Sequence, residues 1–154
     1  MFKRISVQSS KGTVRVKVEG LNGREYNLDT KKYLISTHAK RSFYHLQARE
    51  IIVDVFHPYQ VLEEVTLPGS SIKKSKLALD FMIPSCMMAI EVHGEQHFKY
   101  TPFFHKSKVG FAQAKRRDLD KKEWCRINDI TLVELRWDED SEYWREKIEH
   151  ARTT

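Results

Sequence analysis

The stretch LALDFMIPSCMMAIEVHGEQH, residues 77–97, decides how this chain folds, because it has the pattern of two apolar strands that carry charged side chains. Asp80, Glu91, His93 and His97 lie among residues that would otherwise all be buried. Burying an ionised carboxylate in a strand is unfavourable unless the group is paired or binds a metal ion. Carboxylates on neighbouring strands therefore indicate a functional site.

A Pro-Ser turn separates residues 77–83 from residues 87–93, a connection short enough for an antiparallel hairpin. Side chains alternate along a strand, so Glu91 and His93 point to the same face. If Asp80 shares that face, two carboxylates and an imidazole converge. Carboxylate oxygens suit Mg²⁺ or Mn²⁺, and the imidazole would be a further ligand or a base near neutral pH. This set of groups predicts metal-assisted phosphodiester hydrolysis.

The same residues resemble the signature of the PD-(D/E)xK nuclease superfamily. Asp80 and the run Glu91-Val92-His93 follow in the expected order, and His93 stands where the usual Lys would be. With this histidine the sequence resembles the branch typified by the very-short-patch repair endonuclease and the EDxHD homing nucleases. It also resembles that branch in its DF strand, its HGEQH turn at residues 93–97 and a later D-x-x-K helix. The resemblance covers roughly residues 43–137 and implies a metal-dependent nuclease with its characteristic αβββαβ core.

A helix is predicted over residues 43–56, because Ser42 is a favourable N-cap residue and a proline follows the segment. Glu50 falls on a partly apolar side of this helix. Nucleases of the resembled kind carry an acidic residue on their first helix, which makes Glu50 a candidate outer metal ligand or water-positioning residue. The alternative is a surface charge paired with Arg49 or Lys40.

A second helix is predicted over residues 110–126, after an aromatic and basic loop at 98–109. Asp118 and Lys121 fall on one side of this helix, and the resemblance places both in the site. Lys121 could supply the cation that the strand motif lacks and stabilise charge developing on a phosphate. The alternative is an ordinary helical ion pair of small energy between Asp118 and either Lys121 or Lys122.

Three further segments complete the expected core. Residues 61–67 form a strand interrupted by two glutamates, which indicates an exposed face or a sheet edge. Residues 131–137 alternate as a last strand, and residues 141–152 form an amphipathic helix with Ser141 as its N-cap. The order is the one that the restriction-endonuclease-like fold requires. The expected fold class is α/β (α+β), with a mixed central sheet.

Residues 13–28 alternate around Leu21-Asn22-Gly23, where Asn-Gly is a strong hairpin signal. We therefore expect a β-hairpin appendage over residues 1–36 and a nuclease-like domain over residues 37–154. A chain of 154 residues with 40% hydrophobic residues can bury one such core.

The charge balance favours a polyanionic partner, and with the nuclease-like motif this partner is DNA. Lys and Arg total 27 against 21 acidic residues, so the formal net charge is +6. The expected DNA contacts are basic and aromatic residues of the loop and the second helix: Lys99, Tyr100, Phe103, Phe104, Lys115, Arg116 and Arg117. A solvated basic surface, with the loop aromatics packed on the core, is the alternative.

Other cofactor and localisation classes are disfavoured. Cys86 and Cys125 are too few for a disulfide framework, and they do not provide the structural zinc site of the very-short-patch repair enzyme. No apolar segment resembles a signal peptide or a membrane span, and no glycine-rich loop predicts an organic cofactor. We expect a cytoplasmic protein that uses Mg²⁺ or Mn²⁺.

The sequence therefore predicts a metal-dependent DNA endonuclease. Asp80 and Glu91 would hold the ion, and His93 or His97 would bind metal or activate water. A catalytically inactive nucleic-acid-binding module on the same fold and an RNA-directed nuclease are the alternatives. A double-strand cut would require a homodimer or two successive nicks, and the sequence leaves both open.

Overall fold

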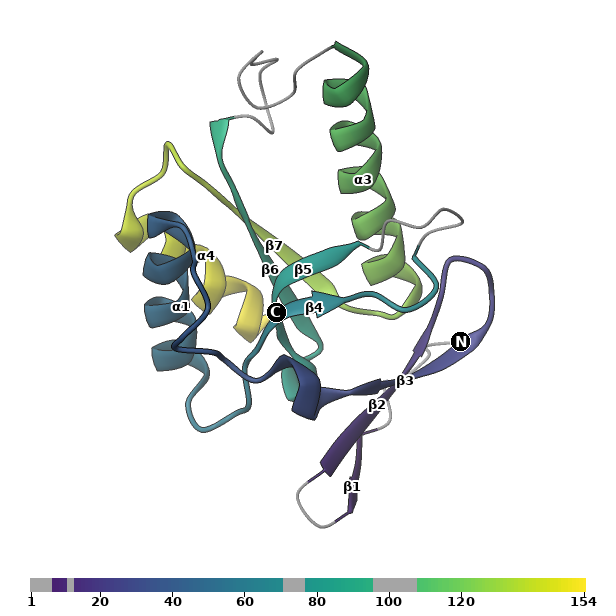
Figure 1. Cartoon of the computed structure of the whole chain (residues 1–154). Helices are drawn as coiled ribbons and strands as arrows, with labels where there is room; N and C mark the ends of the chain where they lie inside the picture. The colour runs from purple at the N-terminus through teal and green to yellow at the C-terminus, as the bar shows by residue number, and fades with distance from the viewer. Residues whose placement is uncertain (1–6, 11–12, 71–76, 96–107) are drawn as a thin grey trace.

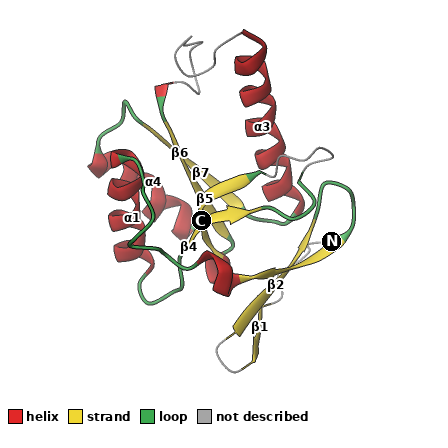
Figure 2. Ribbon diagram, viewed as in Figure 1, coloured by secondary structure: helices red, strands yellow, loops and turns green. Residues whose placement is uncertain are grey.

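The computed structural model describes residues 7–10, 13–70, 77–95 and 108–154, and its class is α+β (Figure 1, Figure 2). From the first helix onward, the described elements run helix, three strands, helix, strand, which confirms the predicted order. The elements are β1 (Val7–Ser10), β2 (Thr13–Glu19), β3 (Glu25–Asp29), η1 (Thr30–Tyr33), α1 (Phe43–Phe56), β4 (Leu62–Thr66), β5 (Ala78–Ile83), η2 (Pro84–Cys86), β6 (Met88–His93), α3 (Lys108–Ile127), β7 (Thr131–Arg136) and α4 (Ser141–Thr153).

The central sheet is mixed and has the strand order β4-β5-β6-β7. β4 pairs antiparallel with β5, and β5 with β6, whereas β6 and β7 are parallel. β6 and β7 can be parallel because α3 lies between them in the chain and carries the chain back to the end of the sheet where β6 begins. β4 is an edge strand, as its two glutamates indicated.

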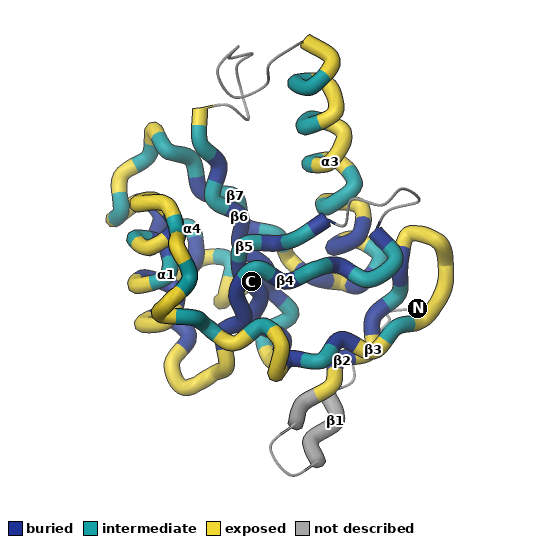
Figure 3. Tube along the Cα trace, viewed as in Figure 1, coloured by how far each residue is buried: buried dark blue, intermediate teal, exposed yellow. Residues whose placement is uncertain are grey.

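Helices cover both faces of this sheet. α1 and α4 lie together on one face and α3 lies on the other (Figure 1). Ile90 belongs to the core beneath α1 and α4, and the neighbouring Ala89 belongs to the core beneath α3. Both cores are visible as dark stretches along the strands in Figure 3, whereas much of α3 is exposed. Because β5 and β6 are covered on both faces, a charged side chain on them is buried unless it lies near a strand end.

Local signals set the starts of the helices. Ser42 caps α1 as predicted, since its side chain accepts a hydrogen bond from the N–H of His45 at 3.2 Å. The predicted cap of α4 is wrong by one residue: Asp140, not Ser141, accepts the N–H of Tyr143, at 2.8 Å. Asp and Ser are comparably good N-cap residues, so sequence alone could not choose between these neighbours.

The N-terminal strands form a second sheet of order β1-β2-β3. The predicted hairpin is present, and its turn closes with a hydrogen bond from the N–H of Gly20 to the carbonyl of Arg24 at 2.9 Å. Gly23 in that turn has a φ of 79°, which suits glycine. The sequence prediction did not include β1. Val16 and Leu28 of this sheet are buried in the same core as residues beneath α3, so the two sheets share apolar packing.

No helix among the described residues is both long enough and apolar enough to cross a membrane.

Asn128 links the N-terminal sheet to the end of α3. Its side chain accepts the N–H of Glu19 at 2.7 Å and donates to the carbonyls of Glu19 and Trp124 at 2.9 Å each. Asn128→Ala should lower the free energy of unfolding by about 1–3 kcal/mol, because it removes partners from buried and partly buried backbone groups. Urea unfolding would measure the loss. Asn27→Ala, at an exposed position of β3, is the matched control, and equal stability of the two variants would contradict the proposed link.

Candidate functional site

The candidate site begins where β5 and β6 separate. Their ladder pairs Phe81 with Ile90 and continues toward the hairpin turn, but it does not include Asp80 and Glu91, the next residues in the register. Instead, the carboxylate of Asp80 accepts the N–H of Val92 through Oδ2, at 2.7 Å. A side chain thus takes the place of a ladder partner. This fork brings the Asp80 carboxylate beside Glu91.

Glu91 is a buried carboxylate whose charge is incompletely compensated. The residue is 3% exposed, and Oε1 has no hydrogen-bond partner among the described residues. Lys121 Nζ lies 3.4 Å from that oxygen as an ion pair. Burial, followed by the neighbouring charge of Asp80, raises the pKa of Glu91 well above its usual range, against the opposing effect of Lys121. Two adjoining carboxylates, one with an oxygen that accepts no hydrogen bond from the described residues, are suited to share a cation.

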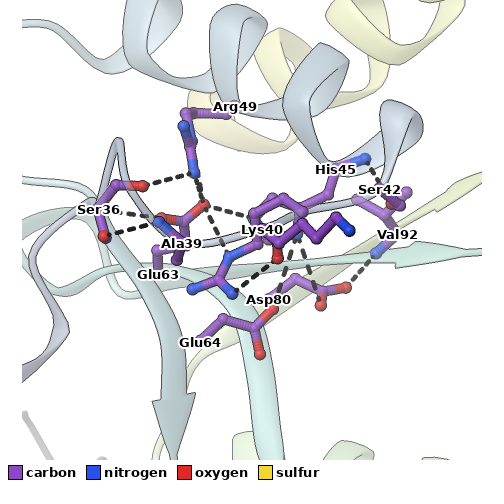
Figure 4. A network of polar contacts seen from close by, with 11 residues as sticks. Ser36, Ala39, Lys40, Ser42, His45, Arg49, Glu63, Glu64, Asp80 and Val92 are labelled. Carbon is purple, nitrogen blue, oxygen red and sulfur yellow. Dashed lines mark hydrogen bonds and ion pairs between the residues drawn. The ribbon is translucent and has the colours of Figure 1, made fainter.

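A second buried glutamate, Glu63 on β4, is fully compensated (Figure 4). It accepts hydrogen bonds from Arg49 Nε at 3.0 Å, from the Ser36 N–H at 3.4 Å, and from His45 Nε2. Burial alone would raise the pKa of Glu63, but the hydrogen bonds and charges of Arg49 and His45 lower it. Glu63 is therefore a charged anchor for two side chains of α1.

The other nitrogen of His45 faces the strand fork. Nδ1 lies 3.8 Å from Glu64 Oε1 and 4.0 Å from Asp80 Oδ1. The imidazole stacks on Phe81 with ring centroids 4.5 Å apart, and the residue is 5% exposed. One ligand atom from each of His45, Glu64 and Asp80 lies within 4.8 Å of the other two. The site thus has a nitrogen donor that the sequence prediction did not include.

His93 is buried on β6, but its Nε2 is directed to Glu134 Oε1 on β7, at 3.4 Å, rather than to Asp80. Lys122 Nζ lies 3.4 Å from the same oxygen. The hydrogen bond from His93, with the charges of His93 and Lys122, lowers the pKa of Glu134 to about 2 despite its partial burial. His93 therefore belongs to a polar cluster on the α3 side of the sheet, next to the carboxylate pair along β6.

The remaining predicted site residues are distributed around this centre. Lys121 reaches Glu91 from α3, and Asp118 lies half-buried one turn earlier. Glu50 is exposed on α1, whereas His45 and Arg49 of the same helix reach the sheet. Among the predicted DNA contacts, Lys115 is half-buried and Arg116 and Arg117 are exposed on α3. His97, Lys99, Tyr100, Phe103 and Phe104 lie outside the described residues.

Sequence reasoning missed His45, Glu63 and Glu64. The glutamates carried the same signal as Asp80, charge inside an apolar strand, but an edge strand offered a simpler explanation for them. His45 and Arg49 are one turn apart on α1, and this spacing could have indicated a shared partner. That partner is buried Glu63 on another element, which no local pattern specifies.

Comparison with known proteins gives only partial similarities. No family model matches the chain, and no solved structure is a significant match. An uncharacterized protein of Invertebrate iridescent virus 6, 307L, is 37% identical over 59 residues, which is 38% of this chain and 30% of that protein. An uncharacterized protein of Invertebrate iridescent virus 3, 033L, is 30% identical over 61 residues, 40% of this chain and 31% of that protein. The matched segments thus cover less than a third of either relative.

The raised pKa of Glu91 predicts a specific pH dependence of stability. Above the ordinary glutamate pKa of 4.5, the folded state holds this proton more tightly than the unfolded chain does, so stability should fall as pH rises through the raised pKa. Glu91→Gln removes this loss. Unfolded by urea in EDTA, the variant should become progressively more stable than wild type as pH rises above 4.5.

The matched control is Glu146→Gln, which changes an exposed glutamate on α4. Its stability should follow that of the wild type across the same pH range. A Glu91→Gln profile parallel to wild type would show that the carboxyl of Glu91 ionises normally in the folded protein.

Proposed function

We propose that this protein is a metal-dependent DNA endonuclease that hydrolyses phosphodiester bonds. The observation that carries the proposal is the meeting of the Asp80 and Glu91 carboxylates with Lys121 at the strand fork. A buried carboxylate such as Glu91 beside a half-buried one such as Asp80 is unfavourable without a counter-charge, and one lysine does not balance two of them. A divalent cation would supply the missing charge.

Asp80 and Glu91 fit Mg²⁺ or Mn²⁺ because they offer hard oxygen donors, one of which has no hydrogen-bond partner among the described residues. When bound, such an ion would act as a Lewis acid on a phosphate oxygen and lower the pKa of a bound water. Asp80 is held for this task by the N–H of Val92, which fixes its Oδ2. The backbone thereby orients the carboxylate before any ligand arrives.

Lys121 has the position of a charge-stabilising residue. Its ammonium lies beside Glu91, and its side chain is 16% exposed, so little water screens it. A phosphate at the carboxylate pair would meet this positive charge as negative charge develops in the transition state. Lys121 would thus take the role of the lysine that usually stands in the strand motif, where this sequence has His93.

The DNA would approach along the basic side of α3. Arg116 and Arg117 are exposed there, one turn before Lys121 on the same helix. Exposed guanidinium groups bind backbone phosphates without selecting a base sequence. The net charge of +6 supports the same partner class.

Asp80→Asn should separate cleavage from binding. The amide oxygen can still accept the N–H of Val92, but the negative charge that attracts the metal is gone. Conversion of supercoiled plasmid in Mg²⁺ or Mn²⁺ should therefore fall by orders of magnitude while salt-sensitive DNA binding persists. Asp129→Asn, at an exposed turn position with a φ of 55° that Asn tolerates, is the matched control and should cut like wild type.

The wild type distinguishes the alternatives in the same assay, with EDTA as the blank. If it binds DNA but leaves supercoiled, linear, branched and single-stranded substrates intact in both Mg²⁺ and Mn²⁺, it is a nucleic-acid-binding module. If it cuts RNA in preference to each of these DNAs, it is an RNA-directed nuclease.

The double variant Arg116→Ala, Arg117→Ala should weaken DNA binding by a similar factor for unrelated sequences. If both side chains contact phosphates, the slope of log affinity against log salt concentration should become shallower by about 2. Fluorescence anisotropy at several salt concentrations would measure it. The variant Lys31→Ala, Lys32→Ala removes the same charge from η1, and an equal change there would mean that α3 is not the docking surface.

A further inference from the structure

His45 is held in one orientation by the anionic side chain behind it. Its Nε2 is hydrogen-bonded to Glu63 Oε1, and Glu63 is itself fixed by Arg49 (Figure 4). The stacked ring of Phe81 restricts the imidazole further. An ionised carboxylate can only accept, so in the neutral imidazole Nε2 carries the proton and Nδ1 keeps its lone pair. A buried carboxylate behind a histidine is the usual support for a histidine that binds a metal ion.

The Nδ1 atom faces two carboxylates, those of Glu64 and Asp80. It lies 3.8 Å from Glu64 Oε1 and 4.0 Å from Asp80 Oδ1, and both distances are longer than a hydrogen bond. Ligand bonds of about 2.0–2.2 Å allow two donors of one ion to lie up to about 4.4 Å apart. The separations from Nδ1 to both oxygens are therefore those of ligands around a common cation.

The backbone of β4 is bent at Glu64, which has a φ of 53°. Leu62 and Val65 on either side of the bend are buried in the same core, although an odd spacing would direct them to opposite faces of a regular strand. The bend thus interrupts the alternation and lets Glu64 lie beside Asp80 while the apolar residues stay buried. Non-glycine residues with positive φ are uncommon and gather at functional sites.

We propose that His45 Nδ1, Glu64 and Asp80 form a second cation position, which shares Asp80 with the Asp80–Glu91 pair and takes a transition ion such as Mn²⁺ in preference to Mg²⁺. The nitrogen donor carries this preference, because imidazole suits first-row transition ions whereas Mg²⁺ favours oxygen ligands only. The inference deepens the proposed endonuclease function, since two ions bridged by one carboxylate can stabilise both the attacking and the leaving oxygen of a phosphodiester. Ion binding itself does not depend on cleavage.

A protonated His45 would serve a different purpose. An imidazolium ion would donate through both nitrogens and hold Glu63, Glu64 and Asp80 together as a structural ion pair, with no lone pair for a metal. Arg41, whose Nε lies 3.7 Å from Glu63 Oε1, and Arg49 are the other cations facing this cluster among the described residues. A direct nitrogen–metal signal separates the two arrangements.

The experiment is electron spin echo spectroscopy of Mn²⁺ added to the wild-type protein, which detects the ¹⁴N nucleus of a coordinated imidazole. We expect nitrogen modulation in wild type and in Glu91→Gln, which retains the second position. The modulation should disappear in His45→Gln and persist in His38→Gln, an exposed control. Absence of nitrogen modulation in wild type, or its survival in His45→Gln, would overturn the proposal.

Two further variants keep the test independent of folding at His45. Glu64→Gln changes a carboxylate that is 40% exposed, and it should weaken Mn²⁺ binding at the second position by at least about tenfold. Glu63→Gln, which removes the charge behind His45 and also weakens the contacts of Arg49, should lower the affinity by about 10–100-fold. Each substitution is combined with Glu91→Gln, and calorimetric titration with Mn²⁺ measures the affinity. If neither double variant binds Mn²⁺ more weakly than Glu91→Gln alone, the site is contradicted. If Mn²⁺ is coordinated by nitrogen but the protein leaves plasmid DNA intact, the proposed endonuclease function is wrong and the proposed ion site is still supported.

Discussion

The hydrogen bond between the Val92 N–H and the Asp80 carboxylate is the contact on which the arrangement of the site depends. It ends the β5–β6 ladder and holds a charged side chain between two strands that are buried on both faces elsewhere. A backbone partner at this position would have continued the ladder and left no room for a polar site. The fork therefore exists because a side chain, rather than a main-chain carbonyl, satisfies this N–H.

Two buried glutamates on this sheet show how differently the same residue type can be accommodated. Glu63 is 3% exposed and is surrounded by donors, so the pKa of its carboxyl is lowered. Glu91 is equally buried at 3%, but its neighbours are another carboxylate and one lysine, so its pKa is raised. The first arrangement is stable without a ligand. The second is improved by any cation that reaches it, which is why we place the functional centre at Glu91 and Asp80.

The rest of the fold keeps these groups in place from several directions. α1 and the adjacent edge strand contribute His45 and Glu63, whereas α3 contributes Lys121 from the opposite face of the sheet. Trp124, one turn after Lys121, is buried and donates its ring N–H to the carbonyl of Pro68 at 3.0 Å. This buried anchor sets the rotation of α3 and therefore the direction in which Lys121 points.

The sequence by itself determined the features that depend on neighbours along the chain. Period-two and helical patterns located the strands of the central sheet and its helices, Ser42 and the Asn-Gly turn are local signals, and the short hairpin connection indicated that Asp80 and Glu91 lie on neighbouring strands. Helical spacing placed Asp118 and Lys121 on the same side of their helix. These features rest on interactions within a turn of helix or across one hairpin, where sequence distance and spatial distance agree.

Only the tertiary structure decided which distant groups share the site. His45 meets Glu63 and Asp80 because α1 packs over β4 and β5, and His93 faces Glu134 because β7 pairs in register beside β6. The exposure of Glu50 likewise depends on which side of α1 the sheet contacts. A charged residue in an apolar strand indicates that a partner is needed. Which residue becomes that partner depends on packing between elements far apart in the chain. Compensation of buried charge is therefore a property of the folded molecule.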